Sequence, residues 1–186
     1  MALVAVVAAC AERPVLTDQT LPAGRCSADG LSVGPLDNDG LPSPVARTRQ
    51  ALLDAAVACD FRAFNQRAVD DATDLRFEGA AFPVQDWRRK ERRGDAVVAP
   101  LARLLALSPA RVQDGNRRLF VWPDAVEWPA ADVAPGSSRA DLEAAVGPDG
   151  VFGWAEAGGY SGWRLAISAN GRWVRYWFGP VAGEYP

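Results

Sequence analysis

The sequence predicts one α+β domain, in which N-terminal helices pack on a bent antiparallel sheet that ends in a C-terminal hairpin. Two observations predict this class. Apolar residues recur at helical spacing after residue 43, whereas the Gly- and Trp-rich final third alternates with a period of two. The strongest short hairpin signal, Asn170-Gly171, lies between two such alternating runs. We expect the domain to cover 44–180 and 181–186 to form a tail.

The helical part begins at Ser43-Pro44, because Ser caps free amides and Pro suits a first helical turn. Asp60 predicts a break, after which a shorter second helix carries Phe61, Phe64 and Val69. The remaining expected elements are helices over 84–93, 100–107 and 139–146 and strands over 75–80 and 119–122.

The turn at Asn170-Gly171 also predicts which side chains of the hairpin share a face. One face is apolar and belongs to the core: Ile167–Val174, Leu165–Tyr176 and Trp163–Phe178. The other face carries Ser168–Trp173, Ala166–Arg175 and Arg164–Trp177, the last as a cross-strand cation–π pair. A candidate interaction surface for a ligand or a homodimer is therefore formed by Arg164, Trp173, Arg175 and Trp177. The alternative is that a neighbouring strand or loop covers the two Trp rings.

The N-terminal residues 1–10 read MALVAVVAAC, and Val7-Ala8-Ala9-Cys10 resembles the lipobox of a bacterial lipoprotein signal. The resemblance implies that Cys10 becomes the lipidated first residue of an extracytoplasmic protein anchored to the cell membrane. The apolar stretch 2–9 is itself too short to span a bilayer. Residues 11–43 are rich in Pro, Gly, Asp and Ser and predict a flexible tether. The alternative is a cytoplasmic protein that starts at Met1 and keeps Cys10 unlipidated.

The other two cysteines, Cys26 and Cys59, predict a disulfide if the protein is exported, because an oxidising compartment favours pairing. The bridge would join the tether to the first helix. The alternative is two buried, inert thiols in the cytosol.

Four segments between residues 44 and 179 resemble, in order, a family of actinobacterial lipoproteins without an assigned function. They read ARTRQALLDAAVACDFRAF, DWRRKERRGDAVVAPLARLL, LFVWP and GGYSGWRLAISANGRWVRYWFG. The opening helix and its acidic break also resemble the nuclear-transport-factor-2-like (cystatin-like) fold. That resemblance implies helices packed in the concave face of a bent sheet, as a cone. A small helical domain with an appended hairpin is the alternative.

Composition excludes several classes of protein. Without His, the chain has no Ser-His-Asp triad, no Cys-His dyad and no HExxH zinc site. A net charge of −3 and a pI near 5.0 argue against a nucleic-acid binder. No nucleotide-binding or Cys-pair metal motif is present, so we expect no cofactor and no metal. The basic run 88–93 is either the solvated face of a helix or a contact for anionic lipid headgroups or phosphate-bearing polymers.

A candidate pocket rim, suited to stacking on sugar rings or apolar ligands, comprises Trp122, Trp128 and Tyr160. The alternative is a loop whose rings pack into the core. Carboxylates are the only acid–base candidates, and spacing singles out no pair among Glu78, Asp86, Glu91, Asp124, Glu127 and Glu156. We therefore expect a non-catalytic, membrane-anchored domain that binds a protein partner or a small ligand. The alternatives are a cell-envelope enzyme of hydrolase or isomerase type and a structural lipoprotein that associates with itself.

Overall fold

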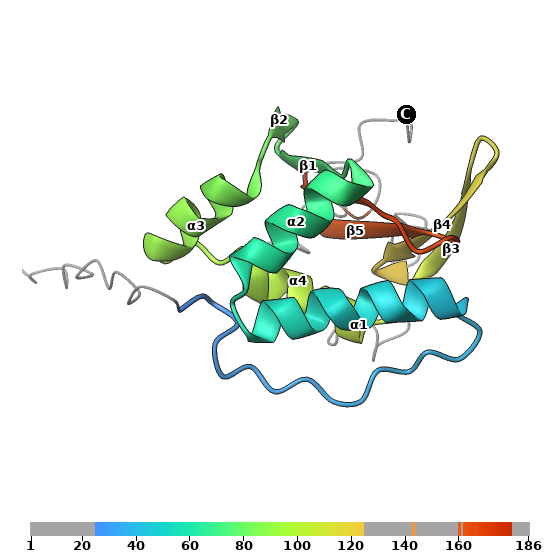
Figure 1. Ribbon diagram of the computed structural model, residues 1–186, viewed down its shortest axis with the longest axis horizontal. Coiled ribbons are helices and arrows are strands. Elements are labelled where there is room, and N and C mark those ends of the chain that lie inside the picture. Colours follow the sequence, from blue (N-terminus) through green and yellow to red (C-terminus); the bar gives the residue numbers. More distant parts are fainter. Residues whose placement is uncertain (1–24, 125–142, 144–159, 161, 180–186) are drawn as a thin grey trace, which may run out of the picture.

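The structure is a computed structural model and describes residues 25–124, 143, 160 and 162–179. Over these residues the chain has an α+β fold, as expected, with helices packed on a mixed sheet (Figure 1). The helices are α1 (Ser43–Val57), α2 (Phe61–Asp71), α3 (Val84–Arg92) and α4 (Val98–Ala106). The strands are β1 (Asp74–Phe77), β2 (Ala80–Ala81), β3 (Ala110–Asp114), β4 (Arg117–Trp122), β5 (Trp163–Ser168) and β6 (Trp173–Phe178). None of the described helices is long and apolar enough to cross a membrane.

The six strands lie in the order β2-β1-β6-β5-β4-β3. All neighbours are antiparallel except β1 and β6, which run parallel with Asp74 opposite Arg175. The expectation of a purely antiparallel sheet is therefore wrong. The reason lies at the end of α2, where the Asp71 carboxylate accepts a hydrogen bond from the Trp173 N–H at the start of β6. The first residues of β1 and β6 therefore lie side by side, and the two strands run in the same direction.

The helices predicted between residues 43 and 107 and the strand over 119–122 are confirmed with small shifts at their ends, although no side chain caps α1. The single strand predicted over 75–80 is wrong, because a turn at Glu78 and Gly79, both with positive φ, divides it into the antiparallel pair β1 and β2. Asp60 separates the first two helices as expected, because its carboxylate accepts hydrogen bonds from the N–H groups of Arg62 and Ala63 and caps α2. Strand β3 is not predicted, since its sequence ARVQD is mostly polar, and its pairing with β4 establishes it. The helix predicted over 139–146 lies outside the described residues apart from Glu143.

The β5–β6 hairpin has the predicted pairing over most of its length: Trp163–Phe178, Arg164–Trp177, Leu165–Tyr176 and Ala166–Arg175. Its turn is one residue longer than expected, because the Ser168 N–H donates to the Arg172 carbonyl and leaves residues 169–171 as the loop. A β-bulge compensates for the extra residue and brings Trp173 opposite Ile167. The pairs predicted beside the turn are therefore wrong, and Trp173 points into the core with 0% of its surface exposed.

The segment 25–43 packs against the helices and is not part of a tether. Cys26 and Ala28 belong to the core, with 3% and 0% of their surfaces exposed. Cys26 is bonded to Cys59 with an S–S distance of 2.11 Å, which confirms the predicted pairing. The boundary expected between tether and domain at 43–44 is therefore wrong. Polar and apolar residues alternate irregularly in this segment, so its burial left no periodic signal.

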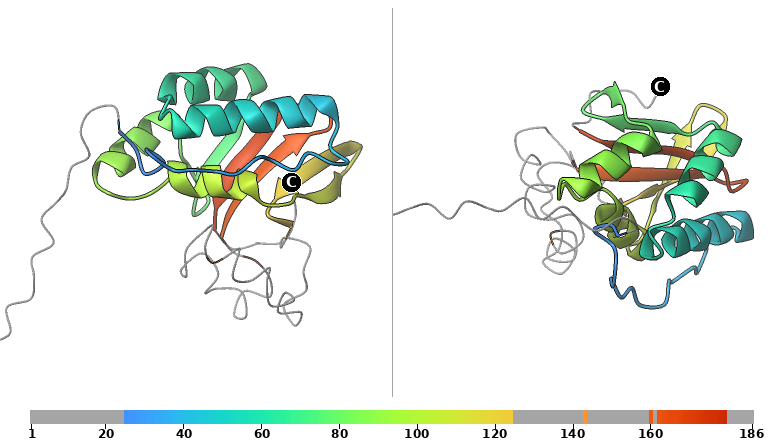
Figure 2. Two further views of the ribbon diagram at one scale, coloured as in Figure 1. Left: turned by 90° about the horizontal axis from the view of Figure 1, so that it is seen from below. Right: turned by 60° about the vertical axis from the view of Figure 1, so that its left-hand side comes forward.

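The helices cover one face of the sheet (Figure 2), and the main core lies between these two layers. The centre of this core is aromatic. The Trp87 indole of α3 lies 5.6 Å from the Phe64 ring of α2 and 5.1 Å from the Tyr176 ring of β6, measured between ring centroids. Trp173 lies 6.1 Å from Trp87 in the same cluster. A smaller apolar cluster, formed by Leu119, Val121 and Ala166, lies on the other face of the sheet. Burial of these rings removes several of the Trp side chains from any outer surface.

Candidate functional site

The β3–β4 turn and the β5–β6 turn lie side by side at the same end of the sheet, because β4 and β5 are antiparallel neighbours. Arg117 and Arg118 follow the β3–β4 turn, and Arg172 follows the β5–β6 turn. These side chains line a hollow of about 300 Å³, which we call the arginine hollow. Its other lining residues are Asp71, Ala72, Ser168, Ala169, Asn170 and Val174.

Contacts with the helices hold the β5–β6 turn beside this hollow. The Gly171 carbonyl accepts hydrogen bonds from the Thr48 hydroxyl at 2.5 Å and from Nη2 of Arg67 at 2.6 Å. Gly171 has φ 87°, and a Cβ at this position would stand 2.7 Å from the carbonyl oxygen of Pro44. Only glycine therefore meets both the backbone conformation and the close approach to α1. The hollow has one wall whose position is set by packing and hydrogen bonds.

Only one of the three arginines that line the arginine hollow forms an ion pair with an acidic side chain of the described residues. Arg117 forms an ion pair with Asp114 at 2.5 Å. The Asp71 carboxylate is already engaged by Arg67 at 2.5 Å, and Arg172 donates to the Asp71 carbonyl. Neither Arg172 nor Arg118 has a carboxylate partner among the described residues. Two guanidinium groups thus leave an excess of positive charge at the hollow.

This arrangement is suited to binding an anion. A guanidinium presents a planar set of N–H donors that matches the two oxygens of a carboxylate or phosphate. The volume of about 300 Å³ is at the small end of ligand pockets, which favours a small molecule or a short side chain. The Ser168 hydroxyl at the hollow donates to the Asn170 side-chain oxygen and to the Arg172 carbonyl, and neither acceptor can act as a general base. The geometry therefore favours binding over nucleophilic chemistry.

The surface predicted on the outer face of the hairpin is only partly present. The cation–π contact of Arg164 with Trp177 is confirmed, at 5.6 Å from the guanidinium carbon to the ring centroid. Arg164 is 1% exposed and also lies over the Tyr160 ring, so its side chain is not available on the surface. Arg175 lies over Trp177 at 5.4 Å and pairs with Asp74 at 3.0 Å. With Trp173 in the core, the predicted surface is reduced to half-buried Arg175 and Trp177.

The predicted pocket rim is also wrong in its described members. Trp122 is 0% exposed, donates its indole N–H to the Leu107 carbonyl at 3.0 Å and lies under the Arg49 guanidinium. Tyr160 is 1% exposed and donates its hydroxyl to the Trp163 carbonyl at 2.8 Å. Burial raises the pKa of Tyr160 well above its usual range. Trp128 lies outside the described residues. Both described rings pack in the core, as the alternative interpretation held.

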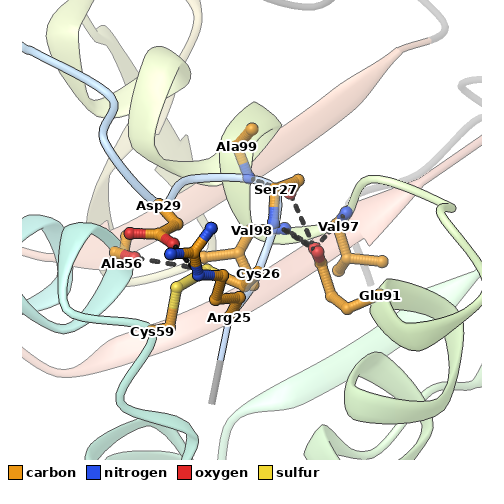
Figure 3. The surroundings of a disulfide bond; sticks show 10 residues. All are labelled: Arg25, Cys26, Ser27, Asp29, Ala56, Cys59, Glu91, Val97, Val98 and Ala99. Carbon is orange, nitrogen blue, oxygen red and sulfur yellow. Dashed lines mark hydrogen bonds and ion pairs between the residues drawn. A yellow bond between two sulfur atoms is a disulfide. The ribbon is translucent and has the colours of Figure 1, made fainter. Parts of the chain in front are cut away.

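Beside the disulfide, the Glu91 carboxylate joins the segment after Arg25 to α3 and α4 (Figure 3). Its oxygens accept hydrogen bonds from the N–H and hydroxyl of Ser27, at 2.6 and 2.8 Å. They also accept from the N–H groups of Val97 and Val98, both at 2.7 Å, at the start of α4. A negative charge at this position also suits the dipole of α4. We call this arrangement the Glu91 clamp, and its role is structural.

Two of the candidate carboxylates, Glu91 and Asp86, are held in structural contacts. Glu91, the one buried carboxylate among the described residues, has both oxygens engaged by backbone and hydroxyl donors. Asp86 pairs with Arg89 on the exposed side of α3, and Glu78 is exposed in a turn. Glu127 and Glu156 lie outside the described residues. The contacts of Glu91 and Asp86 thus assign these two carboxylates structural roles.

Sequence reasoning missed the arginine hollow, although a signal for it exists. Each of the two turns contains Gly and Asn and is followed directly by arginine, in the segments GNRR at 115–118 and NGR at 170–172. Only the adjacency of β4 and β5 shows that these segments meet. Comparisons with protein-family models, with curated proteins and with solved structures find no match. The two family resemblances therefore stay predictions.

Proposed function

We propose that this chain is a non-catalytic, extracytoplasmic domain that is held at a membrane by a lipid on Cys10 and binds a small anionic ligand in the arginine hollow. The observation that carries the ligand part is the meeting of Arg117, Arg118 and Arg172 at one hollow. Arg118 and Arg172 have no carboxylate partner within the described part of the chain, whereas Arg117 pairs with Asp114. The disulfide supports the extracytoplasmic part, because such bonds persist in oxidising compartments. The ligand carries a carboxylate or a phosphate group.

Isothermal titration calorimetry tests the ligand part, with inorganic phosphate and succinate as probes. We expect Arg118→Gln and Arg172→Gln each to weaken binding about tenfold, the loss expected for one charged hydrogen bond of about 1.5 kcal/mol. Arg47→Gln is the matched control, since Arg47 is exposed on α1 and does not line the hollow. Equal affinities of both hollow variants and the parent for both probes would refute the assignment.

Cell fractionation tests the anchor. The parent chain, expressed in a bacterial host with lipoprotein processing, is expected in the membrane fraction. Cys10→Ser removes the atom that would carry the lipid, so this variant is expected in the soluble fraction. Mass spectrometry of the parent should find an acylated N-terminal Cys10. The anchor is refuted if both chains distribute alike and the mass shows no acyl group.

A further inference from the structure

Helix α3 has a buried side and a strongly basic exposed side. Val84, Trp87 and Glu91 face the core, with 3%, 0% and 1% of their surfaces exposed. The exposed side carries Arg88, Arg89 and Arg92, and Arg93 follows as the exposed C-cap residue; we call these four residues the arginine stripe. The stripe follows from helical spacing, since i and i+4 positions lie one above the other.

Two of the four arginines of the stripe form no ion pair with an acidic side chain of the described residues. Arg89 pairs with Asp86 at 2.7 Å, and Arg93 pairs with Asp95 at 3.6 Å. Arg88 lies over the Phe61 ring at 5.2 Å, and neither it nor Arg92 has a carboxylate partner among the described residues. On a chain with a net charge of −3, this is a local excess of positive charge. An anionic surface would gain from meeting it.

The helix that carries the arginine stripe lies beside the segment that starts at Arg25, the first residue of the described chain. Ser27 is bound to Glu91 of α3 through two hydrogen bonds, and Cys26 is bonded to Cys59 (Figure 3). Arg25 thus enters the domain beside α3. Cys10 precedes Arg25 by 15 positions, and a chain of that length spans at most about 50 Å. A lipid on Cys10 would therefore keep Arg25, and with it this end of the domain, within about 50 Å of the bilayer surface, so α3 can reach it.

The arginine hollow lies at the other end of the domain. Its lining residues begin β4 and form the β5–β6 turn, near the β3–β4 hairpin, whereas α3 occupies the opposite end in Figure 1. A domain that rests on α3 thus keeps the hollow open to solvent.

We propose that the arginine stripe rests on the anionic headgroups of the bilayer that carries the anchor, so that the arginine hollow faces away from the membrane. The proposal rests on the lipid anchor at Cys10 that is part of the proposed function. One acyl signal combined with a basic patch holds a protein at a membrane more firmly than either alone. The contact is electrostatic, so salt weakens it.

Vesicle sedimentation tests the contact without the anchor. The oxidised full chain carrying Cys10→Ser is mixed with vesicles of phosphatidylglycerol and phosphatidylcholine in equal parts, or with phosphatidylcholine alone. We expect binding to the anionic vesicles at low salt, none to the neutral vesicles, and loss of binding at about 1 M salt, where the Debye length is about 3 Å.

Two double variants locate the contact. Arg88→Gln with Arg92→Gln is expected to lower the partition coefficient about 25-fold, at about fivefold for each arginine removed from an anionic surface. Arg47→Gln with Arg111→Gln removes the same charge from exposed positions away from α3 and is expected to bind like the parent. Circular dichroism and the urea midpoint verify that all variants are folded.

The proposal is overturned if the Cys10→Ser parent fails to bind anionic vesicles at low salt, or binds neutral vesicles equally well. It is also overturned if both double variants lose binding to the same extent, because net charge rather than the stripe would then account for the binding. The vesicle experiment uses a chain that cannot be acylated at Cys10, so its outcome says nothing about the anchor. The fractionation experiment tests the anchor separately, and finding Cys10 unacylated would refute the anchor without changing the vesicle result.

Discussion

Replacing Glu91 with glutamine exchanges one carboxylate oxygen for an amide NH2 group and leaves the size of the side chain unchanged. In the native protein the two oxygens accept four hydrogen bonds, from Ser27 N–H and hydroxyl and from the N–H groups of Val97 and Val98. Glutamine has one acceptor oxygen, so its NH2 group meets at least one of these donors. Because Glu91 is 1% exposed, water does not replace the lost acceptor.

The free energy of unfolding should fall by about 2–4 kcal/mol. One hydrogen bond to a charged acceptor is lost, at about 1.5–3 kcal/mol, and the other three change to a neutral acceptor, at about 0.5–1 kcal/mol each. A neutral amide is easier to bury than a carboxylate, which offsets about 1–2 kcal/mol of that cost.

Urea unfolding of the oxidised protein, followed by Trp fluorescence, measures the change. Glu78→Gln is the matched control, because Glu78 is exposed and the same substitution there should alter stability by less than about 0.5 kcal/mol. Hydrogen exchange at the amides of Val97 and Val98 should accelerate only in Glu91→Gln. A Glu91→Gln protein within about 0.5 kcal/mol of the parent would refute the reasoning that the carboxylate holds the N-terminal segment to α4.

Three further predictions concern the disulfide, the hairpin and alkaline pH. Reducing the disulfide, which joins residues 33 positions apart, should lower the free energy of unfolding by about 3–4 kcal/mol, and an unchanged urea midpoint in dithiothreitol would contradict this. Trp173→Ala should cost about 3–5 kcal/mol and Trp177→Ala clearly less, since only Trp173 is fully buried; equal losses in urea unfolding would contradict the bulged register. Burial raises the pKa of Tyr160 and Tyr176, so the stability that their neutral hydroxyls contribute is fully present below pH about 10 and is lost as the pH rises above it. Phenolate absorbance of two of the three tyrosines should therefore appear together with unfolding, and titration of all three near pH 10 in folded protein would contradict it.

Most of the helical layer could be predicted because its signals are local. Asp60 caps α2 through the next two N–H donors, and Pro44 suits the first turn of α1. The apolar face of α4 likewise repeats within one helix, with Leu101, Leu104 and Leu105 all buried. Such features depend on residues a few positions apart, which a sequence displays directly.

The candidate site could not be predicted in the same way. The sequence predicts a two-residue turn, which places Trp173 on the outer face. In the structure the longer loop places Gly171 against Pro44 of α1, and the bulge turns Trp173 into the core. The arginine hollow likewise depends on β4 and β5 lying side by side, which brings Arg118 and Arg172 together from distant segments.

By itself, the sequence determined the α+β class, the main helices and the existence of the final hairpin, and it named Cys26 and Cys59 as the pair that an exported protein would join. Tertiary structure alone decided the parallel β1–β6 pair, the burial of Cys26 and Ala28 in the core and the site at which arginines converge. The physical reason is the range of the interactions. Caps, turns and periodicity act between near neighbours in the chain, whereas strand order and a bulge are selected by the packing of residues more than a hundred positions apart, as in the hydrogen bond from Thr48 to Gly171.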